Sequence, residues 1–320
     1  MRIVMMATGD IAIPAFNALA ETGQVVALVT QPDRPVGRHY ETKPPRIKVC
    51  AQERSIPVYQ PEKVSTPEAV AHLRAYEPDL FVVMAYGQLL SQEVIDLPRL
   101  ACINAHASLL PRHRGAACIQ AAIEAGDNKT GITIMHIVKK MDAGDIICTR
   151  EIPLRGRETA ETLHDDLARL APDALLEAIA ALEAGTATRT PQESELATYC
   201  KKLVRADGRL DWTQPAFQVA RKIRAYHSWP GTSTTYVSAR TGQSRELKIF
   251  PPVDVFAGTD PTAEPGTVLE AGPDGLLIAC GGPRGGALRV TSLQIPGGRR
   301  MNAESFFAGH RICPGMVLGR

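Results

Sequence analysis

Short apolar strands alternate with helices along the first half of the chain, and this alternation limits the possible folds more than any other feature. Helical stretches near 11–21, 67–76 and 115–125 separate apolar, β-branched runs at 3–7, 25–30, 80–85 and 101–104. Further strands are predicted over 131–138 and 145–153, with a long helix over 158–184. Such alternation is typical of α/β domains, so we predict a Rossmann-like, doubly wound and mainly parallel sheet.

The chain changes character after this helix. Residues 186–208 are polar and poorly periodic, which is typical of a linker. A helix is predicted over 214–226, and short strands between Gly and Pro turns follow at 232–238, 245–250, 266–271, 275–280 and 287–294. This second pattern predicts a small C-terminal β-barrel that is similar to an oligonucleotide-binding (OB) fold.

Length and composition agree with two domains, because 320 residues with 44% hydrophobic residues exceed what one small core needs. The seven cysteines are scattered and form no CxxC pair, so we expect reduced thiols and no metal site. The start of the chain lacks a basic leader, and no apolar run approaches the ~20 residues that span a bilayer. We therefore expect a soluble, cytoplasmic protein that does not bind membranes.

Charge is distributed unevenly along the chain. Residues 199–224 hold seven Lys and Arg against two Asp, and residues 281–320 hold six Arg against one Glu. Residues 1–198 carry a net charge of −5, although the whole chain carries +2. A basic second half suggests contact with phosphates, while an ordinary solvated surface is the alternative.

One motif carries most of the chemical information. Asn104-Ala-His106-Ala-Ser108-Leu-Leu-Pro-Arg-His-Arg-Gly115 follows a predicted strand, and Asp142-Ala-Gly-Asp145 begins 36 residues after His106. Ligands bind at the carboxyl ends of parallel strands, and alternation places Asn104, His106 and Ser108 on one side. Each residue alone is more often a core histidine or a turn residue. Together, an amide, an imidazole and a carboxylate favour a catalytic site.

These motifs resemble those of the methionyl-tRNA formyltransferase family along essentially the whole chain. The resemblance rests on Thr30-Gln-Pro-Asp-Arg-Pro-Val-Gly-Arg38, Ala85-Tyr-Gly87, the segment 104–115, Gly131-Ile-Thr-Ile-Met135, Asp142-Ala-Gly-Asp145 and Trp229-Pro-Gly231. The Asn/His/Ser-Leu-Leu-Pro motif alone would indicate only the wider folate-dependent formyltransferase superfamily. The insertion at 31–48 and the basic C-terminal half narrow the resemblance to the tRNA enzymes.

The resemblance implies a reaction and its catalytic residues. The α-amino group of methionyl initiator tRNA attacks the formyl carbon of 10-formyltetrahydrofolate, and the tetrahedral intermediate carries an oxyanion. Asn104 and His106 are expected to donate hydrogen bonds to that oxygen. Asp142 is expected to orient His106, hold a water and help transfer the proton. No metal is implied.

The resemblance also implies binding residues and domains. The folate contacts are expected from Tyr86, Gly87, Leu89, Leu90, Ser108, Leu109, Leu110, Pro111 and Val138. Contacts to tRNA are expected from Arg34, Arg38, Lys43, Arg46 and Lys48 in the insertion, and from Lys201, Lys202, Arg205, Arg299 and Arg300. We expect a catalytic domain over 1–190, a linker over 191–208 and an OB-like tRNA-binding domain over 209–320, in a monomer.

This chain departs from the family pattern at several positions. Tyr40-Glu41 stands where the insertion usually carries a lysine pair, which weakens the phosphate argument there. Cys118 replaces a usual proline, and we expect no catalytic consequence from this change. His113 has no evident role, so we expect it at the surface.

Three other functions compete with this interpretation. A sister formyltransferase acting on a sugar nucleotide or a ribotide would use the same catalytic residues but would not need the 31–48 insertion. A nucleotide-dependent dehydrogenase would need a GxGxxG motif, which the first strand and turn lack. A tRNA-binding protein without activity would not need Asn104, His106 and Asp142 together.

Overall fold

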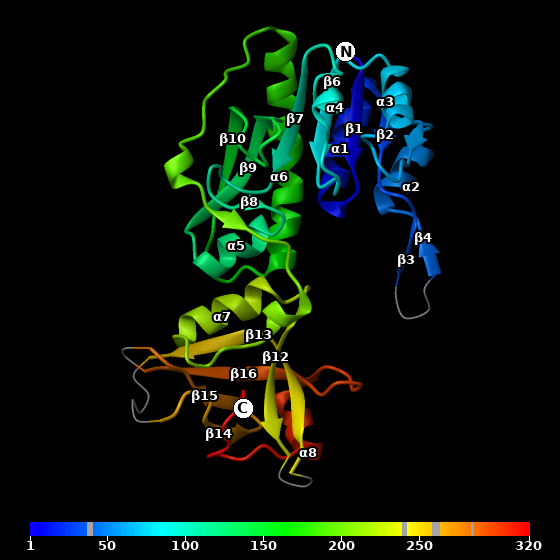
Figure 1. Cartoon of the computed structure of the whole chain (residues 1–320). Helices are drawn as coiled ribbons and strands as arrows, with labels where there is room; N and C mark the ends of the chain where they lie inside the picture. Colours follow the sequence, from blue (N-terminus) through cyan, green and yellow to red (C-terminus); the bar gives the residue numbers. More distant parts are fainter. Residues whose placement is uncertain (37–40, 239–241, 258–262, 283–284) are drawn as a thin grey trace. The chain divides into compact units, whose positions relative to one another are not determined.

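The computed structural model describes residues 1–36, 41–238, 242–257, 263–282 and 285–320. The chain forms two compact units (Figure 1). The first comprises Met1–Cys118, Lys129–Pro153 and Leu163–Lys201. The second comprises Ile119–Asn128, Leu154–Thr162 and Lys202–Arg320.

A seven-stranded sheet forms the centre of the first unit within the described residues. Its spatial order is β10 (Ile146–Pro153), β9 (Lys129–His136), β7 (Ala101–His106), β6 (Leu80–Met84), β1 (Ile3–Ala7), β2 (Val25–Val29) and β5 (Val58–Tyr59). Strands β7, β6, β1, β2 and β5 run parallel, β9 runs antiparallel to β7, and β10 runs antiparallel to β9. Strands β1 and β6 are buried throughout, as expected where helices cover both faces of a sheet. The predicted α/β class and mainly parallel sheet are confirmed.

Helices lie between these strands along the chain, and one more follows the last strand. They are η1 (Asp10–Ala12), α1 (Ile13–Glu21), α2 (Arg46–Glu53), α3 (Pro67–Arg74), α4 (Gln92–Ile95), α5 (Cys118–Ala125) and α6 (Ala160–Glu183). Local chemistry sets several starts: the Thr66 side chain accepts the Ala69 N–H at the start of α3, and Ser91 does the same for Val94 in α4.

Two predicted boundaries were wrong near the motif. The strand expected over 101–104 continues to His106, because β9 pairs with it as far as that residue. The helix expected from 115 begins only at Cys118, because β8 (Arg114–Gly115) is extended and pairs with β11 (Tyr199–Cys200). The segment before β11 includes η2 (Ser194–Leu196).

The insertion at 31–48 contains regular structure that the sequence did not predict. Strands β3 (Arg34–Val36) and β4 (Glu41–Lys43) pair as an antiparallel ribbon, and α2 begins at Arg46. All three residues of β4 are exposed. Arg38 lies outside the described residues.

The second unit contains a curled antiparallel sheet, which confirms the predicted small barrel-like fold. Its order is β12 (Thr232–Val237), β13 (Ser244–Phe256), β16 (Ala287–Gln294), β15 (Gly275–Ala279) and β14 (Val268–Gly272), with β17 (Met301–Asn302) also paired to β16. The remaining elements are η3 (Arg205–Gly208), α7 (Ala216–Ala225) and α8 (Ala303–Gly309). Strand β13 continues beyond the predicted end at residue 250, since an irregularity between Phe250 and Val253 absorbs the two prolines there.

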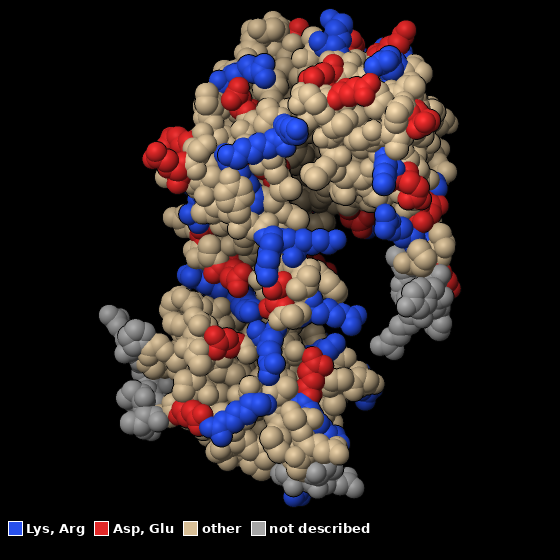
Figure 2. Space-filling model, viewed as in Figure 1, with Lys and Arg blue, Asp and Glu red and all other residues tan. Residues whose placement is uncertain are grey.

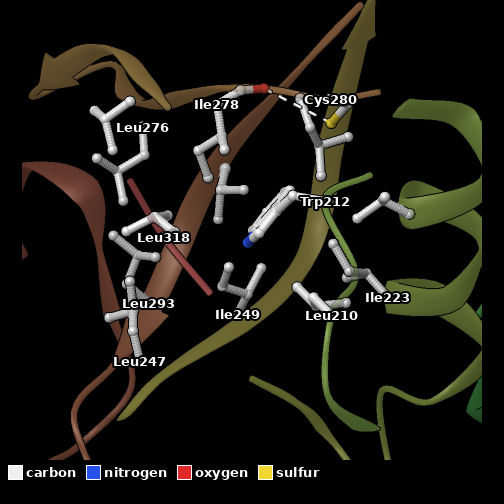
Figure 3. Close-up of a cluster of buried hydrophobic side chains, with 14 of the residues drawn as sticks. Leu210, Trp212, Ile223, Leu247, Ile249, Leu276, Ile278, Cys280, Leu293 and Leu318 are labelled. Carbon is white, nitrogen blue, oxygen red and sulfur yellow. Dashed lines mark hydrogen bonds between the residues drawn. The ribbon is translucent and has the colours of Figure 1, made fainter. Parts of the chain in front are cut away.

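An apolar cluster of buried side chains holds this second unit together (Figure 3). Trp212 lies in its middle, surrounded by side chains from the sheet and from α7, and its indole Nε1 donates to the Thr234 hydroxyl at 3.0 Å. Burial of each Leu or Ile in such a cluster contributes ~1.5–3 kcal/mol. The unit therefore has its own hydrophobic core.

Candidate active site

The end of β7 brings His106 into a buried position. The ring is 6% exposed, and its Nε2 donates to the His113 carbonyl oxygen at 3.0 Å. A carbonyl only accepts hydrogen bonds, so Nε2 must carry a proton. The other ring nitrogen, Nδ1, lies 3.8 Å from Oδ2 of Asp142. The structure thus brings the predicted imidazole and carboxylate together.

Asp142 lies on the loop that joins β9 to β10, in a left-handed backbone conformation with φ of 48°. Its Oδ2 accepts the Gly115 backbone N–H at 2.8 Å, which fixes the carboxylate beside His106. A Cβ atom at Gly144 would lie 1.8 Å from the His136 carbonyl oxygen. The glycine in Asp-Ala-Gly-Asp is therefore required by the close approach of the loop to β9.

The surroundings of His106 favour its protonated form. Burial lowers the pKa of His106, but the Cys118 thiol, the Asp142 carboxylate and the His113 carbonyl outweigh this and raise it to about 9. Contact between Cys118 and the imidazole is a finding that the sequence did not predict.

The expectation that His113 lies at the surface was wrong. His113 is buried, with φ of 58°, because its amide N–H donates to the Thr198 hydroxyl at 2.8 Å while its carbonyl binds His106. Its backbone therefore fixes the orientation of the imidazole.

A cavity of about 400 Å³ lies beside Asp142 in the first unit. Asn104 and Asp142 both line it, and His106 lies next to Asp142. Of the predicted folate residues, the cavity is lined by Tyr86, Gly87, Leu89, Leu90 and Val138. Four other lining residues lie outside the two segments expected at this site, 85–90 and 138–142, and they are Val83, Ile95, Met135 and Ile137.

The cavity wall combines apolar side chains with irregular backbone. Leu89 is 79% exposed at the rim, whereas Tyr86 is 2% exposed and packs in the core. The 85–90 loop is therefore anchored by Tyr86 and offers the Leu89 side chain to the cavity. Ala85 and Gly87 adopt positive φ values of 48° and 89°. Such a wall suits a flat heterocycle that binds backbone groups on one edge.

The other predicted folate segment does not line this cavity. Ser108 is fully buried, and its hydroxyl donates to the Arg112 carbonyl at 2.7 Å. The Thr133 hydroxyl donates to the Ser108 carbonyl and accepts the Leu110 N–H. The segment from Ser108 through Leu109 and Leu110 to Pro111 is thus an internally bonded turn that follows β7.

The basic residues of the insertion differ in how they are held. The Lys48 ammonium lies 2.7 Å from Asp33 and is only 17% exposed, while Arg46 pairs with Asp10 but is 77% exposed. Arg34 donates to Gln31, and Lys43 pairs with Glu41. Lys48 is therefore tied into the fold, whereas Arg46 and Lys43 present their charges to solvent.

The second group of predicted basic residues is largely exposed. Lys201, Lys202, Arg205 and Arg299 have exposed positions. Arg300 is anchored, because it donates to Ser292 and the Pro251 carbonyl and lies over the Phe250 ring. Figure 2 shows Lys and Arg side chains next to Asp and Glu on the face of the second unit in view.

Two kinds of feature are absent from the described residues. No cluster of His, Cys, Asp or Glu suitable for a metal ion occurs in the part of the chain that the structure describes. Across the same ranges, no helix combines the length and the apolar character that crossing a bilayer requires.

Comparison with known protein families matches both units. The formyl transferase family model matches residues 1–179, and the formyl transferase C-terminal domain model matches residues 202–311. A methionyl-tRNA formyltransferase of Akkermansia muciniphila is 58% identical over 97% of each chain. Another, of Geobacter metallireducens, is 41% identical over 100% of this chain and 99% of its own.

Solved structures share the fold at low identity. HypX from Aquifex aeolicus, solved with tetrahydrofolic acid, aligns with a TM-score of 0.60 at 19% identity, and this chain covers 47% of its length. WlaRD, a sugar 3N-formyltransferase, aligns with a TM-score of 0.64 at 15% identity over 91% of this chain and 97% of its own.

Proposed function

Because this chain belongs to the methionyl-tRNA formyltransferase family, we propose that it transfers the formyl group of 10-formyltetrahydrofolate to the α-amino group of methionyl initiator tRNA. The observation that carries the proposal is that Asn104 and Asp142 line one cavity and His106 lies 3.8 Å from Asp142, in a chain matched over its length by that family. The product serves translation initiation.

The attacking amine needs little activation, since free α-amino groups have pKa values of about 7.7–8.0. Its nitrogen bonds to the formyl carbon, and the carbonyl oxygen becomes an oxyanion. The place of Asn104 in the cavity wall supports its amide as a donor to that oxygen. Donors of this kind contribute ~3–4 kcal/mol to other enzymes.

Asp142 and His106 then take part in proton transfer. The Asp142 carboxylate receives the proton lost by the amine and returns it to the folate nitrogen as the carbon–nitrogen bond to the folate breaks. The protonated His106 carries positive charge near the oxyanion and stabilises the Asp142 carboxylate. The raised pKa of His106 and the 3.8 Å separation from Asp142 support this assignment.

Folate binding is proposed for the cavity beside Asp142. Its apolar side chains suit the faces of a pterin, and the backbone of the 85–90 and 138–142 loops suits the amide edge. We assign the predicted segment from Ser108 to Pro111 a supporting role, since its polar groups already bond within the protein.

Binding of tRNA is proposed for the insertion and for the basic residues of the second half. Exposure of Arg46, Lys43, Lys202, Arg205 and Arg299 supports phosphate contacts. We propose the domain division expected from the sequence, which is a catalytic domain over 1–190, a linker over 191–208 and a tRNA-binding domain over 209–320. We also propose that the protein is a monomer that acts in the cytoplasm.

An acceptor competition tests this function. The purified protein and 10-formyltetrahydrofolate are incubated with methionyl initiator tRNA, free methionine and an amino-sugar nucleotide, and the formylated product is identified by mass spectrometry. We expect formyl-methionyl-tRNA. Formylation of the sugar nucleotide in preference to the tRNA would overturn the proposal and favour the sister enzyme.

A further inference from the structure

Gln192 makes the contacts that hold the turn carrying Asp142. Its side-chain Nε2 donates to the Asp142 carbonyl at 3.0 Å and to the Gly144 carbonyl at 2.8 Å. Two carbonyls face the nitrogen and a guanidinium faces the oxygen, so the orientation of the amide is determined by its neighbours. This glutamine comes from the polar stretch that the sequence identifies as a linker.

Arg114 supports Gln192 from the other side. Its side chain is 1% exposed, and it donates to the Gln192 oxygen from two nitrogens, at 2.7 and 3.1 Å. A third nitrogen donates to the Tyr199 hydroxyl at 3.1 Å. The buried positive charge of Arg114, hydrogen-bonded to the amide oxygen, polarises the amide and strengthens its N–H groups as donors.

Backbone contacts from the same two segments reach the catalytic residues directly. The Arg114 N–H donates to the Thr198 carbonyl at 2.8 Å, while the next residue, Gly115, donates to the Asp142 carboxylate. The Thr198 hydroxyl accepts the N–H of His113, whose carbonyl orients His106. The 190–200 segment therefore contacts both the carboxylate turn and the support of the imidazole.

We propose that Gln192, held by Arg114, is a positioning residue that sets the Asp142 carboxylate for formyl transfer. Asp142 has a positive φ, which a non-glycine residue keeps only where its surroundings enforce it. The two bonds from Gln192 hold the backbone of this turn, while the Gly115 N–H holds the carboxylate. This inference rests on the proposed function, because it concerns the same reaction.

The primary test is Gln192→Met, which keeps the length of the side chain and removes its hydrogen bonds. We expect kcat to fall by about 10- to 100-fold, since a displacement of about 1 Å can cost ~10² in rate. KM for methionyl-tRNA should change by less than about twofold. Gln192→Glu keeps the acceptor for Arg114 but loses the donor, so it should be equally impaired.

Thr188→Val is the matched control. Its hydroxyl donates to the Ile147 carbonyl at 2.9 Å, so the variant loses one hydrogen bond in a neighbouring part of the chain without touching the Asp142 turn. We expect wild-type kcat. Circular dichroism at the assay temperature confirms that all variants are folded.

The pH profile separates positioning from a general structural effect. The titratable groups that face His106 are Asp142 on its loop and Cys118 at the start of α5, and Cys200 on β11 lies next to Cys118. If the Asp142 carboxylate moves away from His106 in Gln192→Met, the pKa of His106 that appears in the pH profile of kcat/KM should fall by roughly 0.5–1. A uniform loss at every pH would overturn the proposal.

A double-mutant cycle supplies the second criterion. If Gln192 acts through Asp142, Gln192→Met should cost little further activity in an Asp142→Asn background. Equal costs in both backgrounds, or a Gln192→Met enzyme with wild-type kcat, would refute the positioning role. A wild-type protein that formylates no methionyl-tRNA would instead refute the proposed function, so the two failures are distinguishable.

Discussion

Gly115→Ala should damage both stability and catalysis, because this glycine lies where β8 meets β11. Its φ of 115° falls in a region that disfavours side chains. A Cβ atom there would lie 2.1 Å from the Cys200 carbonyl oxygen, more than 1 Å inside normal contact. The two strands cannot remain paired as they are, and the Gly115 N–H that binds Asp142 must move with them.

The magnitude follows from these contacts. Backbone strain costs ~1–2 kcal/mol, and forcing atoms into a packed site costs ~1–3 kcal/mol. We therefore expect the free energy of unfolding to fall by about 3 kcal/mol. Since the Asp142 carboxylate loses its N–H donor, kcat/KM for formyl transfer should fall by about 100-fold.

Gly185→Ala provides the control, because Gly185 has φ of 67° but no atom within 4 Å of the added Cβ. This variant should lose about 1 kcal/mol and retain activity. Urea unfolding and initial rates of methionyl-tRNA formylation measure both quantities. Equal losses in the two variants would show that backbone strain alone matters and that contact with the Cys200 carbonyl adds nothing.

Three further predictions concern charge. His106→Gln or Asp142→Asn should reduce kcat/KM by at least ~100-fold while circular dichroism and tRNA binding stay unchanged, and full activity would exclude their roles. The folded-state pKa of His106, about 9, lies above its ordinary value of 6.5, so its stabilising contribution is complete below about pH 6.5 and is lost as pH rises through 9. Urea unfolding at pH 6 and pH 9 should therefore show a larger loss in wild type than in His106→Gln, and identical losses would contradict the assignment. Arg38→Ala should raise KM for methionyl-tRNA with little change in kcat, and Lys202→Ala should weaken tRNA binding and its salt dependence; an unchanged KM or salt slope would remove that residue from the interface.

Much of the first unit could be predicted from local pattern. Buried parallel strands are continuous apolar runs, and β1 and β6 match their predicted ranges closely for that reason. The ribbon of β3 and β4 could not be predicted in the same way. Each of its strands is only three residues long and β4 is exposed throughout, so periodicity carries no signal there.

The candidate site shows the same division. Asn104, His106 and Asp142 could be identified because their residue types and order resemble a family pattern. His113 and Cys118 could not be assigned, since their closeness to the imidazole depends on a turn that the sequence does not specify. Gln192 gave no signal at all, because a glutamine in a polar stretch is ordinary surface composition.

The sequence by itself determined the alternation of strands and helices, the basic second half and the choice of candidate catalytic groups, because these depend on residue type and short-range spacing. Tertiary structure alone decided how those groups are held. Arg114 and Gln192 are 78 residues apart, and His113 and Thr198 are 85 apart, yet they bond beside Asp142. Such contacts arise when the backbone of β11 approaches β8 at Gly115, and no local pattern encodes that approach.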